Sequence, residues 1–361
     1  MRDAAQRSSA EIDLDTEVAP TTLRRSWLVG AAALAVAATL LGLMLGPVTM
    51  APHRVLLELL DHVPGVRVRS GLSPSNAAIV WKIRAPRVAL GLLVGAMLAV
   101  SGGAYQGAFR NPLADAYLLG VAAGAGLGAT IAIASGAHSG GGGSQLIPIA
   151  AFGGALIAVT LTLALSATHS GERGPASLIL AGVAIAAFFT ALQTFVLQRH
   201  VDTIREVYSW ILGELGGATW RSVWLLLPYV IVTSGVLLAA RNSLDVLSVG
   251  DAEATTLGIN PQRVRLVVVI AASLGTAAAV AMSGLIGFVG IIVPHTVRLL
   301  AGTSYRIVLP LSLLGGAAFL TAADLLARTA FAPGTIPLGV VTACIGAPFF
   351  LVVLRLSKVD R

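Results

Sequence analysis

Long apolar runs alternate with short polar segments along most of the chain. Nine of these runs are long, and they cover about residues 27–47, 88–108, 117–135, 146–168, 177–197, 222–240, 264–283, 307–330 and 336–354. Because a helix needs about 20 apolar residues to cross a bilayer, each run predicts one transmembrane helix. A tenth run, 285–301, is shorter and contains Pro294 and His295, so we expect a broken helix that crosses only part of the bilayer beside other helices. The pattern predicts an all-α membrane protein with about ten transmembrane helices.

The polar segments indicate the topology. Residues 1–26 are polar and carry both signs of charge, which predicts a disordered tail. The run 27–47 is longer than the apolar core of about 7 to 15 residues found in signal peptides, so we expect it to be retained as a helix. An even number of spans places both termini on one side, and a slight excess of Lys and Arg there indicates the cytoplasm. We therefore expect a multi-pass protein of the bacterial cytoplasmic (inner) membrane, with its transmembrane domain at 27–358.

Composition agrees with this interpretation and excludes several functions. Hydrophobic residues make up 56% of the 361 and charged residues 11%, against about 25% charged residues in soluble domains. The net charge of +7 comes from Lys and Arg in short segments between apolar runs, so we expect it to orient the chain in the lipid bilayer, with no nucleic-acid partner. Cys344 is the only cysteine and the six histidines show no ligand spacing, so we expect no disulfide within the chain and no metal site. We likewise expect no cofactor in this chain.

Three connections carry further information. The glycine-rich segment 136–144 lacks the Gly-Lys-Ser/Thr ending of a phosphate-binding loop, so it predicts a linker and no ATP site. Residues 199–221, with two tryptophans, predict an interfacial helix and turn. In 242–262, Asp251 is suited to cap a helix and Gly258 to end it, with Pro261 just beyond, which predicts a short helix outside the membrane. Capping alone leaves a solvated connector as an equal alternative.

Several motifs resemble one known family. The segment 284–298, Gly-Leu-Ile-Gly-Phe-Val-Gly-Ile-Ile-Val-Pro-His-Thr-Val-Arg, resembles the signature of the iron-siderophore and cobalamin permeases of type II ATP-binding cassette (ABC) importers. The match continues with Ile-Arg-Ala-Pro-Arg at 83–87, Asn-Pro-Leu-Ala at 111–114, Gly-Asp-Ala-Glu-Ala at 250–254, and the segments 324–328 and 337–341. These motifs occur in order between about residues 80 and 350, so the resemblance covers most of the chain and implies the type II ABC importer permease fold.

The resemblance implies a permease that pairs with itself or with a similar subunit and binds two ATP-binding subunits, which hold ATP and Mg²⁺. The short helix near 251–257 would then be the coupling helix that docks on the ATPase. Its expected contact residues are Gly250, Asp251, Glu253, Ala254, Leu257 and Gly258.

The resemblance also implies external arginines that dock an extracytoplasmic substrate-binding protein. These are Arg84, Arg87 and Arg328. Lipid headgroup binding is the alternative for Arg84 and Arg87. We also expect Arg328 to pair with Asp324 one helical turn earlier, which makes Asp324 structural and not a proton carrier.

The remaining site residues concern the substrate pathway. We expect Asn111-Pro112 and Pro294-His295 to face each other as irregular backbone near the pathway. For His295, a structural role with a hydrogen bond is favoured over a role as substrate ligand. By position, Gly174, Pro175 and Ala176 correspond to the family's cytoplasmic gate.

The resemblance implies ATP-driven import of an iron chelate. A ferric siderophore is the favoured substrate, and cobalamin and haem are the alternatives. The permease itself is not expected to be an enzyme. An ion-coupled secondary transporter would require carboxylates or unwound coordinating segments in mid-membrane. An intramembrane enzyme would require a nucleophile and a base on facing helices. We therefore consider these two alternatives less well supported.

Overall fold

The computed structural model describes residues 22–62, 65, 68–137, 145–167, 175–332 and 334–359. These residues form helices and turns and contain no strand. In chain order the helices are α1 (Arg25–Met44), α2 (Pro52–Asp61), α3 (Pro74–Ile79), η1 (Val80–Arg84), α4 (Ala85–Phe109), α5 (Val121–Ala134), α6 (Leu146–Ala167), α7 (Pro175–Arg199), η2 (Val201–Thr203), α8 (Ile204–Ile211), α9 (Trp220–Ala239), α10 (Arg241–Val249), α11 (Asp251–Thr256), α12 (Pro261–Ser283), α13 (Val289–Ala301), α14 (Tyr305–Thr329) and α15 (Leu338–Val359).

Seven helical segments within the described residues are long and apolar enough to cross a membrane, and three shorter apolar helices accompany them. The seven contain α1, α4, α6, α7, α9, α12 and α14, and the three are α5, α13 and the first part of α15. Seven and three make the ten expected spans, which confirms the predicted fold class. The span containing α4 is continuous with α3 and η1 over Pro74–Phe109; its 36 residues reach roughly 54 Å, so this rod is longer than the bilayer core is thick.

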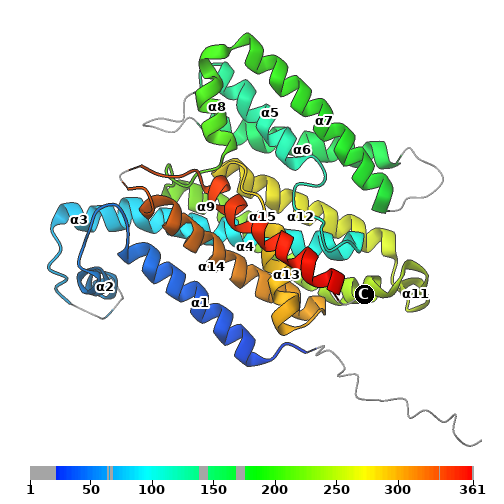
Figure 1. The fold of residues 1–361 in the computed structure, drawn as a ribbon, viewed down its shortest axis with the longest axis horizontal. Helices are drawn as coiled ribbons and strands as arrows, with labels where there is room; N and C mark the ends of the chain where they lie inside the picture. Colours follow the sequence, from blue (N-terminus) through cyan, green and yellow to red (C-terminus); the bar gives the residue numbers. More distant parts are fainter. Residues whose placement is uncertain are drawn as a thin grey trace, which may run out of the picture.

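Helix α4 is the centre of the bundle. In the most apolar 18-residue stretch of the span that contains it, 83% of the residues are buried. The helix packs against α9, α12, α13 and α14. Figure 1 shows α1 along one edge, and α5, α6, α7 and α8 together at the opposite edge. The start of α1, the C-terminus and α11 lie at the same end of the bundle (Figure 1), as an even number of spans requires. The side of the membrane on which this end lies stays a prediction.

Glycines allow the two closest approaches of α4. A Cβ atom on Gly95 would collide with the backbone carbonyl of Gly316 in α14, and one on Gly102 with that of Gly290 in α13. Because helices in lipid associate mainly through close packing of small residues, these contacts fix α4 against both neighbours.

The short span α13 differs from expectation in one respect. The helix is not broken at Pro294 and His295 but runs through them, and the irregular stretch precedes it at 284–288, with positive φ angles at Gly284 and Phe288. Proline leaves the carbonyl four residues earlier without its helical donor. Here that carbonyl belongs to Gly290, and the Gln106 side-chain amide of α4 donates to it at 3.0 Å. A neighbouring helix therefore satisfies the group that proline frees.

The segment 199–221 forms η2, α8 and a turn before α9. This confirms the predicted helix and turn. The Trp220 indole nitrogen donates to the Trp81 carbonyl at 2.9 Å, so the turn is attached to η1. Its place at a membrane surface stays a prediction.

Candidate functional site

The predicted coupling segment folds as two helices, α10 and α11, joined at Gly250. Helix α11 ends as the sequence predicts. Gly258 has a φ of +79°, and its amide donates to the Thr255 carbonyl while the Ile259 amide donates to that of Ala254, both at 3.0 Å. This pair of bonds is the Schellman arrangement, which favours glycine at the left-handed position.

The start of α11 corrects the sequence prediction. Gly250 occupies the capping position without a side-chain bond, and Asp251 is the first helical residue. The Asp251 carboxylate instead pairs with two arginines. The Arg265 guanidinium of α12 donates to both carboxylate oxygens at 3.1 and 3.2 Å, and Arg110 lies 3.1 Å from one of them. Asp251 therefore ties α11 to the bundle.

The other expected ATPase contacts are divided by burial. Ala254 is fully buried, so in this conformation it presents no surface to a partner. Glu253 and Gly258 are exposed, and Leu257 exposes 67% of its surface. An apolar side chain held in the open at the end of the bundle suits a docking surface, and the docking role of the exposed residues stays a prediction.

A second carboxylate in this segment was missed by sequence reasoning. Asp245 of α10 accepts a hydrogen bond from the Ser304 hydroxyl at 2.7 Å and from the Tyr305 amide at 2.6 Å. Its other near neighbour is the Arg306 guanidinium, at 3.5 Å. These partners form the first turn of α14, about 60 residues away, and no local pattern around Asp245 indicates them.

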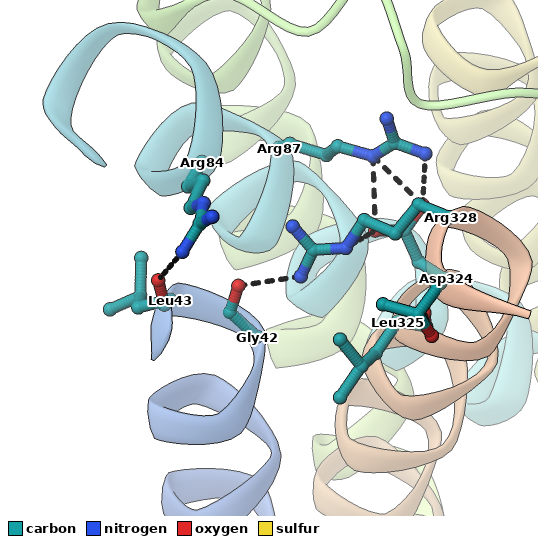
Figure 2. A network of polar contacts seen from close by, with 8 residues as sticks. Gly42, Leu43, Arg84, Arg87, Asp324, Leu325 and Arg328 are labelled. Atoms are coloured by element: carbon teal, nitrogen blue, oxygen red, sulfur yellow. Dashed lines mark hydrogen bonds and ion pairs between the residues drawn. The ribbon is translucent and has the colours of Figure 1, made fainter. Parts of the chain in front are cut away.

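Two of the three predicted docking arginines, Arg87 and Arg328, contact Asp324 at the end of the bundle opposite α11, and Arg84 lies nearby at the end of α1 (Figures 1 and 2). Arg87 bonds both oxygens of the Asp324 carboxylate, with distances of 2.9 to 3.0 Å. Arg328 lies 3.4 Å from the same carboxylate, which confirms the predicted pair one turn apart. The carboxylate is buried and held by two cations, an arrangement that supports the structural role expected for it.

Arg84 and Arg328 also hold the C-terminal end of α1 (Figure 2). Arg84 donates to the carbonyls of Leu43 and Met44 at 2.9 Å, and to that of Val48. Arg328 donates to the Gly42 carbonyl at 2.5 Å. The last carbonyls of a helix have no partner within it and carry partial negative charge, so two guanidinium groups stabilise them.

The burial of these side chains bears on the docking prediction. Arg84 and Arg328 are 3% and 2% exposed, and their guanidinium groups face carbonyls of this chain. In this conformation neither is turned toward an external partner. Arg87 keeps 15% of its side chain exposed and is the most accessible of the three. Docking of a binding protein here stays a prediction.

The predicted pathway residues are brought together only through their neighbours. The Gln106 amide donates to the carbonyls of Ala114 and Gly290, and Tyr117 bonds both the carbonyl and the amide of Ile286, at 2.8 and 2.9 Å. The contacts thus join residues 114–117 to 286–290. These contacts are therefore close in sequence to Asn111-Pro112 and Pro294-His295 but are made by other residues.

The environment of His295 differs from the expected one. Its Nε2 is buried without a hydrogen-bond partner, and its ring packs edge-on against Phe349 of α15, with centroids 5.9 Å apart. Gly174 of the predicted gate lies outside the described residues. Helix α7 begins at Pro175, and Ala176 is exposed in its first turn.

Asp115, in the connection between α4 and α5, is a further group that the sequence did not single out. Its Oδ1 accepts a hydrogen bond from the Ala116 amide at 2.7 Å. Burial raises the pKa of this carboxyl to about 6, and the Ala116 amide partly opposes the rise. A carboxyl in such surroundings changes its charge near neutral pH.

Comparison with known proteins gives consistent matches. The model of the FecCD transport family matches residues 34–356. The Halobacterium salinarum protein named cobalamin import system permease protein BtuC is 44% identical over 286 residues, which cover 79% of this chain and 75% of the relative. The vitamin B12 import system permease protein BtuC of Escherichia coli O127:H6 is 38% identical over 285 residues, covering 77% of this chain and 84% of the relative.

One solved structure extends the likeness to three dimensions. It is described as "An inward-facing conformation of a putative metal-chelate type ABC transporter" and superimposes with a TM-score of 0.79 at 28% identity. The match covers 92% of this chain and 99% of that chain.

Proposed function

Because the chain belongs to the FecCD transport family of ABC transporter permeases, we propose that it imports a corrinoid of the cobalamin class, driven by separate ATP-binding subunits. The observation that supports this substrate is the similarity to a relative named as a cobalamin permease, which is 44% identical across 79% of this chain. A ferric siderophore is the second candidate, and it is favoured by the structural neighbour, which is described as a transporter of the metal-chelate type. Both substrates are large organic chelates of a metal ion.

In the proposed transporter, this chain forms the membrane pathway together with a second permease subunit. A second permease subunit would cover the exposed apolar faces of α7 and α15, where Leu180, Phe195 and Leu351 are 72%, 59% and 62% exposed. The substrate would then pass along the interface between the two subunits. The proposal places the chain in the bacterial inner membrane with both termini and α11 in the cytoplasm, where the ATPase binds.

Asp324 supports ATP-driven transport over ion coupling. A proton carrier must release and bind a proton during transport, but Asp324 is held by Arg87 and contacts Arg328. Both oxygens of its carboxylate accept hydrogen bonds from Arg87. The carboxylate is therefore suited to join helices and not to relay protons.

Uptake by a deletion strain tests the substrate. Cells that lack the gene should lose uptake of labelled cobalamin, retain uptake of a labelled ferric siderophore, and recover the first when the gene is restored. Loss of siderophore uptake with normal cobalamin uptake would refute the corrinoid assignment.

The energy source is tested separately. Uptake should stop on ATP depletion and continue after a protonophore has collapsed the proton gradient while ATP is maintained. The opposite response would indicate a secondary transporter.

A further inference from the structure

Two carboxylates attach the segment α10–α11 to different parts of the bundle. Asp245 binds the first turn of α14 through Ser304 and Tyr305. Asp251 binds Arg265 of α12 and Arg110, the residue that follows α4. The Asp251 carboxylate therefore joins α11 to both α12 and the end of α4.

Arg265 is the centre of this connection. It is only 3% exposed, and two of its three guanidinium nitrogens donate to different helices. Its Nε donates to the Ala108 carbonyl in the last turn of α4 at 2.8 Å, while its Nη2 donates to Asp251. The guanidinium thus bridges α11 and α4 directly.

The same arginine lines a cavity next to the predicted gate. The cavity has a volume of about 280 Å³ and is bounded by α6, the first turn of α7 and the start of α12. Ser166, Ser177 and Leu178 are among its lining residues, together with Arg265. One buried side chain therefore lies between the coupling helix and the open space beside α7.

Arg110 supplies the second cation from an unusual backbone conformation. It ends α4 with φ 49° and ψ 37°, the left-handed region that residues other than glycine rarely adopt. Its guanidinium lies 3.1 Å from Asp251. The end of α4 is thus joined to Asp251 by Arg110 directly and by Arg265 through the Ala108 carbonyl.

We propose that Asp251 is a positioning residue that, through Arg265 and Arg110, transmits movement of α11 to α4, α12 and the cavity at the start of α7. This inference rests on the proposed function, in which an ATP-binding subunit docks at α11. It changes the role expected for Asp251 from ATPase contact to internal link. The exposed Glu253 and Leu257 provide the docking surface, and the Asp251 carboxylate couples that surface to the helices.

The test uses the full complex of permease, ATP-binding subunit and binding protein in proteoliposomes, with Asp251→Asn compared with Glu253→Gln. Both variants remove one negative charge from α11 and keep the side-chain shape. Asp251→Asn should keep the amount of bound ATP-binding subunit within twofold and lower substrate transported per ATP hydrolysed at least tenfold. Glu253→Gln should weaken subunit binding and retain transport per ATP.

A second variant tests the link from its other partner. Arg110→Asn removes the guanidinium and retains a residue that tolerates the left-handed conformation. It should also lower transport per ATP, and combining it with Asp251→Asn should add little to the loss of Asp251→Asn alone, because residues in one network are not additive. Because Arg110 is 37% exposed, this variant keeps the test decisive if Asp251→Asn fails to fold.

The outcomes separate this inference from the proposed function. Normal transport per ATP in both single variants, or fully additive losses in the double variant, would overturn the role of Asp251. A wild-type complex that hydrolyses no ATP and moves no substrate would instead overturn the proposed function. Loss of the bound ATP-binding subunit in Asp251→Asn would return Asp251 to the docking surface and so also refute the link.

Discussion

Replacing Asp324 by Asn should destabilise the protein strongly, because the carboxylate is the only anion in the cluster of Arg84, Arg87 and Arg328 as the described residues show it. Three guanidinium groups and one carboxylate give the cluster a formal charge of three minus one, or +2. The substitution raises it to +3 without changing the side-chain volume. Arg328 would then lie beside Arg87 with no carboxylate between them.

The size of the effect follows from burial. Asp324 and Arg328 are each 2% exposed, so water cannot replace the lost partner. Removing one member of a buried ion pair typically costs about 3–5 kcal/mol. The three hydrogen bonds from Arg87 at 2.9 to 3.0 Å engage both oxygens of the carboxylate, and we expect a loss within that range.

Equilibrium unfolding of the purified chain in mixed micelles, followed by loss of helical circular dichroism, measures this loss. Asp202→Asn provides the matched control, because Asp202 is exposed and surface changes stay within about 0.5 kcal/mol. Adding Arg87→Gln to Asp324→Asn restores the cluster charge to +2 and should recover part of the stability. A loss below about 1 kcal/mol for Asp324→Asn would refute the argument that this carboxylate holds the cluster together.

Three further predictions concern local structure. Gly102→Ala should cost about 1–3 kcal/mol in the same unfolding assay, because the alanine Cβ would meet the carbonyl of Gly290 and the helices must separate. In the control Gly30→Ala, within α1, a Cβ would meet nothing within 4 Å and alanine is the better helix former, so this variant should be neutral or slightly more stable; equal effects would contradict the close approach. Gly258→Ala should cost roughly 1–2 kcal/mol of stability in the last turn of α11, because it places alanine in the left-handed conformation at φ +79°. Amide hydrogen exchange in that turn should become faster, and unchanged exchange would count against the Schellman end. The pKa of Asp115 is raised to about 6 in the folded state, so the stability of the wild-type protein should fall as pH rises from about 4 through 6. At pH 7.5, Asp115→Asn should therefore be more stable than wild type by at most about 3 kcal/mol. Parallel pH profiles of stability for the two proteins would contradict the shift.

Local sequence patterns were enough to predict the elements whose cause is local. Apolar run length is enough to predict spans, since lipid requires each segment to satisfy its own backbone bonds in a helix. Gly258 was predictable as a helix end because helices often end on a left-handed residue, a conformation that costs glycine less than other residues. The pair Asp324 and Arg328 was predictable because residues four apart in a helix lie on one face.

Where the cause is not local, the sequence predictions were incomplete or wrong. Asp251 matched a capping pattern, but its carboxylate is drawn to two arginines that only packing brings near. Pro294 suggested a broken helix, but Gln106, far away in sequence, satisfies the freed carbonyl and the helix continues. A local pattern names the available donors and acceptors without showing which distant partners compete for them.

Which arginines face inward depends on how the helices pack. Arg84 reaches α1 across about 40 residues, and Arg87 reaches Asp324 across 237. These partners meet because close packing of α4 against α14 and α1 leaves buried carbonyls and a carboxylate that need donors. The sequence sets the length and polarity of each helix, and only their packing determines which charge each guanidinium neutralises.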